Sequence, residues 1–258
     1  MEELIAKIKE KPSLHNLSNE FIKKHIDSYL TSYHPDLTKK AEKTKLIKYV
    51  RRKINIAFGM FQTKKINKLP VLLEQLKHNP NSLELHNQIL ATNKSTLERL
   101  PFYSEIYKKI LNKEKSILDI GCGLNPFSYP YMNKKITYYA YDLYTQPIQE
   151  YFNIKKIKGE AKDIDLGDQK NYTFPKTDIC FLFKVLDSLE KKVHKKAERL
   201  IKSIPAKKIV VSFPLKTLKN KVMTTQERNW LKRMTERLNY SLDHFKTENE
   251  IFYIIRKK

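Results

Sequence analysis

An apolar run that ends in two closely spaced glycines is the strongest constraint on how this chain folds. The stretch is SILDIGCGLNPFSYP, residues 116–130, and it holds Gly121 and Gly123 although the whole chain has only five glycines. A short apolar run followed by glycines predicts a buried strand that ends in a tight turn and leads into a helix. In an open parallel sheet, such turns lie at the carboxyl edge, where ligands bind.

The pattern after residue 116 predicts an α/β domain. Further short apolar runs occupy residues 136–143, 177–186, 207–213 and 250–257, and a helical pattern covers residues 191–204. Alternating strands and helices predict a parallel sheet with crossover helices. We therefore expect a Rossmann-like sheet with helices on both faces in residues 113–258, preceded by an α-helical region in residues 1–112.

The first 112 residues are patterned as helices. Residues 16–33 carry apolar side chains at helical spacing after Ser18, a candidate N-cap, and residues 44–62 place their apolar side chains on one face. We expect further helices at residues 69–76, 82–90 and 95–111.

The charge of the chain indicates a polyanionic partner. The net charge is +23, from 51 Lys and Arg against 28 Asp and Glu. Between Lys39 and Lys68 there are eleven basic residues, and only Glu42 opposes them. A solvated helix face normally mixes both signs, so this cluster favours phosphate binding over plain solubility or attraction to a membrane surface. The residues predicted to bind RNA are Lys45, Lys48, Arg51, Arg52, Lys53, Lys64, Lys65, Lys216, Lys219 and Lys221.

Several classes of protein are not expected. The sequence has no apolar run long enough to cross a membrane and no secretory signal at its beginning. Its two cysteines, Cys122 and Cys180, form neither a disulfide framework nor zinc-site spacing, so we expect no metal and a reduced, cytoplasmic setting. We expect a monomer.

Two carboxylates at strand ends indicate the ligand of the glycine turn. Asp119 precedes Gly121 by two residues, where its charge would repel a pyrophosphate and attract a cation. The third glycine of a dinucleotide-binding loop is also missing. Asp142 ends the next strand, 21 residues after Gly121, where an acidic residue hydrogen-bonds ribose hydroxyls. S-adenosylmethionine, which is cationic and carries a ribose but no phosphate, fits this pattern. Asp163, where a third strand would end, is placed to face the adenine amino group.

The methyl acceptor is narrowed by what the sequence lacks. Methylation at carbon five of a pyrimidine needs an activated cysteine, and both Cys122 and Cys180 lie in apolar or turn segments. The N/D-P-P-Y/F turn typical of exocyclic amino methylation is replaced by FLFKVLD, residues 181–187. A ring nitrogen such as guanine N7 needs no general base, so positioning would supply most of the catalysis.

From about residue 93 onward, the chain resembles the small-subunit ribosomal RNA guanine-N7 methyltransferases that give aminoglycoside resistance. The matching segments, in the family's order, are STLERL (95–100), LDIGCGLNPF (118–127), AYDL (140–143), FLFKVLDSLE (181–190), VVSFPLKTL (210–218) and EIFYII (250–255). Differences from the family pattern occur at Asn93, at Asp187 and in KNKVMTTQ, residues 219–226, all near the target side.

The resemblance implies roles for individual residues. Arg99 would approach the cofactor carboxylate, Asp142 the ribose, and Asp163 with Ile164 the adenine. Lys184 would border the target base as a catalytic positioning residue, with no general base. The cofactor-binding residues expected in all are Arg99, Asp119, Gly121, Gly123, Asp142, Leu143, Asp163, Ile164 and Phe183.

The leading hypothesis is an RNA methyltransferase that docks on ribosomal RNA or the small subunit and methylates guanine N7, with S-adenosylmethionine as donor. Two alternatives remain open at this point. One is methylation of another RNA or nucleotide. The other is a non-enzymatic RNA-binding or ribosome-assembly factor that retains the fold.

Overall fold

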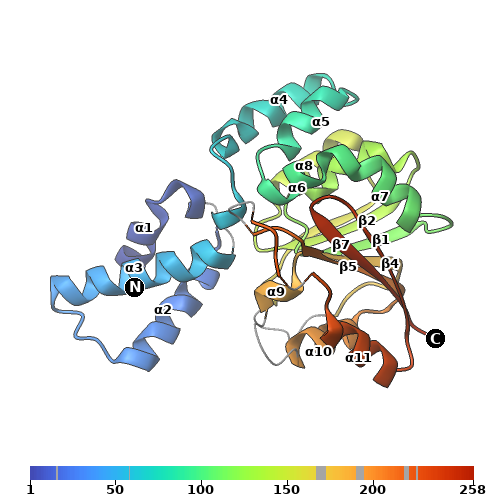
Figure 1. Ribbon diagram of the computed structural model, residues 1–258. Helices are drawn as coiled ribbons and strands as arrows, with labels where there is room; N and C mark the ends of the chain where they lie inside the picture. Colours follow the sequence, from blue (N-terminus) through green and yellow to red (C-terminus); the bar gives the residue numbers. More distant parts are fainter. Residues whose placement is uncertain (16, 58, 167–172, 190–194, 218–220, 225) are drawn as a thin grey trace. The chain divides into compact units, whose positions relative to one another are not determined.

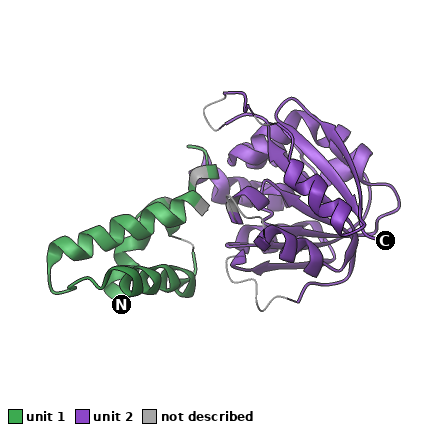
Figure 2. Ribbon diagram, turned by 60° about the horizontal axis from the view of Figure 1, so that its bottom comes forward, with its two compact units in different colours: residues 1–64 green, residues 65–258 purple. Residues whose placement is uncertain are grey.

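The computed structural model describes the chain except for residues 16, 58, 167–172, 190–194, 218–220 and 225 (Figure 1). It divides into two compact units, Met1–Lys64 and Lys65–Lys258, which Figure 2 distinguishes by colour. We call them unit 1 and unit 2.

Unit 1 is a small helical bundle. Its helices are α1 (Glu2–Lys9), α2 (Asn19–Tyr33) and α3 (Lys40–Ala57), with short 3-10 turns η1 (Pro12–Leu14) and η2 (Gly59–Phe61). The Ser18 hydroxyl caps α2 by accepting a hydrogen bond from the Phe21 amide at 3.1 Å, as the sequence predicts. α3 packs against both α1 and α2. Its apolar stripe of Leu46, Val50 and Ile54 is fully buried, and helical periodicity thereby accounts for the core of unit 1.

The strands of unit 2 form one mixed sheet. They are β1 (Ser116–Ile120), β2 (Thr137–Asp142), β3 (Gly159–Asp163), β4 (Thr177–Phe183), β5 (Ala206–Pro214), β6 (Ser241–Lys246) and β7 (Glu250–Arg256). The order in the sheet is β3-β2-β1-β4-β5-β7-β6. β1 to β5 pair with one another in parallel, whereas β7 runs antiparallel to both β5 and β6. The predicted Rossmann-like sheet is confirmed.

Helices cover both faces of this sheet. On one face lie α4 (Leu69–His78), α5 (Leu83–Leu90), α7 (Tyr103–Ile110) and α8 (Gln146–Lys155), and on the other lie α10 (Lys195–Ser203) and α11 (Asn229–Arg237) (Figure 1). Each face of the sheet has its own hydrophobic core, and neighbouring residues of one strand pack in different cores. Ile117 packs in the first and Leu118 in the second, because successive strand side chains point to opposite faces. This explains why β1 and β4 read as continuous apolar runs.

The division between the units lies earlier in the chain than the predicted boundary at residue 112. The helices from α4 to α7 belong to unit 2, because apolar residues of α4, α5 and α7 share one core with the sheet. Leu76 and Tyr103, for example, are fully buried in the same cluster as Ile117. The methyltransferase unit of the structure therefore includes about 48 residues, 65–112, that the sequence pattern grouped with the N-terminal helices.

Several local elements differ from the sequence expectation. The single helix expected at 95–111 is α6 (Lys94–Arg99), the 3-10 turn η4 (Leu100–Phe102) and α7, because Pro101 cannot continue a helix from α6. The segment after the glycine turn is the 3-10 helix η5 (Asn125–Met132), which contains Pro126 and Pro130. β6 is not predicted by the sequence pattern, because four of its six residues are polar and exposed at the edge of the sheet. The remaining elements are η3 (Ile66–Lys68) and α9 (Leu186–Leu189).

The described helices include none that combines the length and apolar character of a membrane span.

Candidate active site

The predicted site residues of unit 2 converge on one edge of the sheet. Asp142 ends β2, Asp163 ends β3 and Lys184 follows β4 directly. Asp142 and Asp163 are register partners across β2 and β3. Because β1 to β4 run parallel, their carboxyl ends meet at this edge, which is where open α/β sheets bind ligands.

The glycine turn after β1 needs both glycines for steric reasons. Gly121 has a φ of +67° and Gly123 a φ of +51°, in the left-handed region that side-chain-bearing residues avoid. A Cβ on Gly121 would lie 2.5 Å from Cγ2 of Val185, the residue after Lys184. The Gly121 amide donates to the Tyr141 carbonyl at 2.6 Å, which ties the turn to the end of β2. The turn is thus a close junction of β1, β2 and β4.

Asp119 is a buried carboxylate with one unused oxygen. Its Oδ2 accepts hydrogen bonds from the Tyr138 hydroxyl at 2.6 Å and the Asn125 amide at 2.8 Å. Its Oδ1 is buried and has no partner among the described residues. Burial raises the pKa of Asp119 to about 6, against the opposing effect of these two hydrogen bonds. An unpaired buried oxygen is costly, so this carboxylate is suited to a positively charged ligand group.

Asp142 is oriented by the backbone around it. Its Oδ2 accepts from the Gly123 amide at 2.7 Å, and its Oδ1 accepts from the Leu143 amide at 2.6 Å. Burial raises the pKa of Asp142 even though both hydrogen bonds favour the charged form. Each carboxylate oxygen can accept further hydrogen bonds, so the fixed group can receive a pair of neighbouring hydroxyls.

Asp163 has a structural role that the sequence did not indicate. Its Oδ1 accepts from both the amide and the hydroxyl of Thr145, each at 2.7 Å. Thr145 is the N-cap residue of α8, so Asp163 connects the end of β3 to the start of that helix. The neighbouring Ile164 side chain is buried, and its amide donates to the Asp142 carbonyl at 2.7 Å. Asp142, Asp163 and Ile164 therefore form one hydrogen-bonded corner at the end of β2 and β3.

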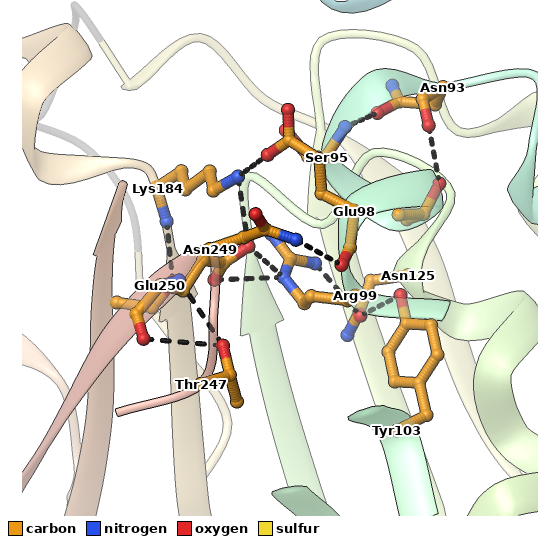
Figure 3. A network of polar contacts seen from close by, with 12 residues as sticks. Asn93, Ser95, Glu98, Arg99, Tyr103, Asn125, Lys184, Thr247, Asn249 and Glu250 are labelled. Carbon is orange, nitrogen blue, oxygen red and sulfur yellow. Dashed lines mark hydrogen bonds and ion pairs between the residues drawn. The ribbon is translucent and has the colours of Figure 1, made fainter. Parts of the chain in front are cut away.

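Arg99 lies in a buried polar network rather than on a helix surface (Figure 3). Its Nε donates to both oxygens of Glu250, at 2.8 and 3.1 Å, and its Nη1 donates to Asn125 Oδ1 at 3.3 Å. The guanidinium also stacks near Phe183, 5.0 Å from the ring centroid. Through Asn125 this network connects to Asp119.

Lys184 completes the network from the other side (Figure 3). Its Nζ lies 3.0 Å from Glu250 Oε1 and pairs also with Glu98. Its backbone has a φ of +59°, and its amide donates to the carbonyl of Ser212 at 3.0 Å. This left-handed conformation is uncommon for a lysine, and at the carboxyl edge of the sheet it is consistent with a functional position.

Glu250 is the carboxylate that joins these two cations. It is fully buried, and burial alone would raise its pKa. The charges of Arg99 and Lys184 overcome that effect and hold the pKa of Glu250 below its usual value.

Sequence reasoning missed the partners in these networks. The sequence pattern indicates Asn125 and Glu250 only as members of the segments LNPF and EIFYII, and Tyr138 only as a strand residue. The available signal was a carboxylate at the start of an otherwise apolar strand, since a buried charge requires a partner.

The predicted RNA-binding residues occupy different environments. In unit 1, Arg51 donates to the Lys7 carbonyl and lies 3.5 Å from Glu10, so it ties α3 to α1. Lys45 pairs with Glu42 at 2.7 Å. Within the described part of the chain, Lys48 and Arg52 are exposed and make no ion pair.

The other predicted RNA-binding residues lie in both units. In unit 1, Lys53 is exposed beside Tyr49, and Lys64 is exposed at the end of the unit. Lys65 and Lys221 are exposed in unit 2. Lys216 pairs with Glu248 at 2.6 Å. Lys219 lies outside the described residues.

Comparison with known proteins places the chain in a family. The family described as ribosomal RNA methyltransferase (FmrO) matches residues 44–254. The chain belongs to this family. The expected methyltransferase activity and its methyl donor, S-adenosylmethionine, are thereby confirmed.

Individual relatives agree with this membership. A curated 16S rRNA (guanine(1405)-N(7))-methyltransferase of Proteus mirabilis is 25% identical over 89% of this chain and 92% of its own length. Among solved structures, the 16S rRNA methyltransferase RmtF in complex with S-adenosyl-L-homocysteine has a TM-score of 0.77 at 20% identity. The superposition covers 100% of this chain and 98% of RmtF. The 16S rRNA methylase RmtB has a TM-score of 0.75 at 19% identity, with 100% of this chain and 98% of RmtB covered.

Proposed function

We propose that this protein methylates N7 of a guanine in small-subunit ribosomal RNA. The observation that carries the proposal is the alignment of 89% of the chain with a 16S rRNA guanine-N7 methyltransferase, over a region that contains the whole glycine turn and its carboxylates. A cytoplasmic location and a monomeric enzyme are part of the same proposal, because ribosomal RNA is the substrate and one chain supplies both the basic unit and the methyltransferase unit.

The residues at the carboxyl edge fit S-adenosylmethionine, which supplies an electrophilic methyl group on a sulfonium. The unpaired Oδ1 of Asp119 would accept from the amino group of the methionine part. Asp142 would bind the ribose hydroxyls, with Leu143 beside it, and Asp163 with Ile164 would border the adenine. Gly121 makes room for Val185, whereas at Gly123 the nearest atom to an added Cβ would be Asn93 Nδ2 at 3.7 Å, so the cofactor can approach the backbone there.

Arg99 retains donors for an anionic group after its internal contacts are made. A guanidinium has five N–H groups, and the hydrogen bonds to Glu250 and Asn125 use Nε and Nη1. We place the cofactor carboxylate beside the remaining donors, with Phe183 packed against the guanidinium.

The side chains around the site suit a reaction that needs no base. Burial raises the pKa of both Cys122 and Cys180 well above the usual value, so neither thiol is a nucleophile at neutral pH. The Lys184 ammonium is held by two carboxylates, which suits it to positioning rather than proton transfer. Guanine N7 attacks through its own lone pair, so alignment of the base with the methyl group is the main requirement.

Docking on the RNA would use the exposed cations of α3. Lys48 and Arg52 are four positions apart and therefore project from the same helix face. Phosphate contacts from such a face supply affinity without reading sequence.

The proposal is tested by incubating the protein with isolated small subunits and labelled S-adenosylmethionine. The position of the label in the ribosomal RNA is then found by mass mapping. We expect one labelled guanine, and its N7 methylation should make the RNA strand cleavable at that position after reduction and aniline treatment. Label found only in transfer RNA or protein would refute the ribosomal target, and an unlabelled RNA with intact cofactor binding would favour a non-enzymatic RNA-binding factor.

A further inference from the structure

Unit 1 carries an aromatic cluster next to its basic helix face. The cluster consists of Tyr29 and Tyr33 of α2 and Tyr49 of α3, which are all the tyrosines of unit 1. The ring centroid of Tyr33 lies 4.6 Å from that of Tyr29 and 5.6 Å from that of Tyr49, and the last two are 4.9 Å apart. We call these three residues the tyrosine cluster.

The members of the cluster differ in exposure. Tyr29 is buried, with 7% of its surface accessible, and Tyr49 is half-buried. Tyr33 is 58% exposed although two rings support it. Packing between α2 and α3 accounts for Tyr29 and Tyr49, and Tyr33 covers part of both rings while more than half of its own surface stays exposed. A supported, outward-facing ring presents a surface on which another planar group can stack.

Positive charge lies on α3 beside the Tyr49 ring of this cluster, although Lys45 also pairs with Glu42. Tyr49 follows Lys45 by four residues and precedes Lys53 by four, so the three form one stripe of α3. The Lys53 ammonium lies 5.4 Å from the centroid of the Tyr49 ring. Arg52, three residues after Tyr49, is exposed without an ion pair in the described residues. Cations on the helix beside an aromatic cluster with an exposed ring can hold a nucleobase and its phosphates together.

We propose that Tyr33 is a stacking site for an unpaired nucleobase of the docked RNA. The inference rests on the proposed function, in which unit 1 docks on structured RNA, and it adds a requirement for a base that is not paired in a helix. The occupant is an extrahelical or loop nucleotide, because a base inside a duplex has both faces covered by its neighbours. The cations of α3 would contact the phosphates on either side of it, and the stacking would tolerate any base.

Binding of the full-length protein to two defined RNAs tests the proposal. One is a hairpin with a loop of unpaired nucleotides, and the other is a blunt duplex of matched length and charge. Tyr33→Ala should weaken hairpin binding by roughly 5- to 150-fold and leave duplex binding unchanged. The slope of log affinity against log salt should stay at its wild-type value, because tyrosine neutralises no phosphate. Tyr33→Phe should bind the hairpin like the wild type.

Three controls separate stacking from other effects. Lys48→Ala should weaken the binding of both RNAs. It should also reduce the magnitude of the slope of log affinity against log salt by roughly 0.7–0.9. Val71→Ala removes an exposed apolar side chain from unit 2 and should change neither affinity. Tyr33→Leu keeps an apolar side chain over Tyr29 and is used if Tyr33→Ala does not fold. In that case, stacking is supported if Tyr33→Leu binds the hairpin weakly while Tyr33→Phe binds it normally.

Equal hairpin affinity of wild type and Tyr33→Ala would overturn the inference, and so would equal losses on hairpin and duplex. If Tyr33 served only to bind a protein, Tyr33→Ala would keep wild-type RNA affinity, so a selective loss of hairpin affinity argues against that role. Failure of the proposed function is recognised separately. In that case the wild type would not methylate small-subunit RNA, whatever Tyr33 contributes to binding the hairpin.

Discussion

Arg99 and Glu250 are 151 positions apart in the chain, yet Arg99 Nε lies 2.8 Å from Glu250 Oε1 in a site that excludes water from both side chains. Lys184 Nζ lies 3.0 Å from the same oxygen. One carboxylate at the start of β7 therefore compensates two cations, one from the end of α6 and one from the end of β4. The cofactor side and the expected target side of the site share this single anion.

We expect Glu250→Gln to destabilise unit 2 strongly. Glutamine keeps the shape of the side chain but leaves Arg99 and Lys184 without their common charge, and breaking a buried pair on one side costs about 3–5 kcal/mol. Urea unfolding measures the change. Glu248→Gln is the matched control, because this carboxylate is two residues earlier and pairs with Lys216 at 2.6 Å while 68% exposed. Its loss should cost less than about 1 kcal/mol. Similar losses in both variants would contradict the network.

We expect Asp119→Asn to stabilise the ligand-free protein above pH 6. The pKa of Asp119 is raised from 3.8 to about 6, so its contribution to stability is present below pH 3.8 and is lost as the pH rises through 6. Because the variant removes that loss, its free energy of unfolding at pH 7.5 should exceed that of the wild type by about 2–3 kcal/mol. Thermal or urea unfolding measures the difference. The gain should vanish near pH 4. A less stable variant at pH 7.5 would show that the charged form stabilises the fold.

Asp178→Asn provides a control of opposite sign. Backbone hydrogen bonds led by that from the Lys115 amide lower the pKa of Asp178, so its contribution is present above its unfolded pKa and is lost as the pH falls. Asp178 lies at the start of β4, away from the carboxyl edge. We therefore expect this variant to be less stable than the wild type at neutral pH, with unchanged cofactor affinity. Asp119→Asn should instead bind S-adenosylmethionine more weakly, because an amide replaces the anion.

Asp142→Ala should weaken the binding of S-adenosylmethionine by about 1.5–3 kcal/mol, the value of a hydrogen bond to a charged group. The two backbone amides that fix this carboxylate, Gly123 and Leu143, would also lose their acceptor. Isothermal titration calorimetry measures the affinity, and Asp178→Ala is the control at the opposite edge of the sheet. Wild-type affinity in Asp142→Ala would refute the ribose assignment.

Reversing two charges of α3, Lys48→Glu with Arg52→Glu, should reduce affinity for small-subunit RNA and leave cofactor affinity unchanged. The same pair of changes at Lys195 and Arg199 is the control, because these exposed residues have identical spacing on α10 of unit 2. Filter binding over a range of salt concentrations measures both, and only the α3 variant should show a shallower salt slope. Equal RNA binding by wild type and the α3 variant would reject docking through this face.

Local patterns predicted much of the fold. The glycine turn, β1, β2, β4, β5 and β7 could be located because strand periodicity, glycine conformation and apolar runs act over a few neighbouring residues. Ser18 was found as a helix cap for the same reason. The sequence pattern indicates the polar edge strand β6 and the helix break at Pro101 only weakly. The boundary at Lys64 depends on which core the helices after it join, and the sequence pattern does not report this.

The sequence by itself determined that a strand, a glycine turn and two strand-end carboxylates belong to one methyltransferase domain. The tertiary structure decided which charges meet. Glu250 joins Arg99 and Lys184 only because β7 inserts antiparallel beside β5, and Asp163 supports α8 only because β3 lies beside β2. These buried charges meet across 151 positions of the chain for Arg99 and Glu250 and across 66 for Lys184 and Glu250, so their pairing depends on strand order. Periodicity and propensity report only on each residue's immediate neighbours in the chain.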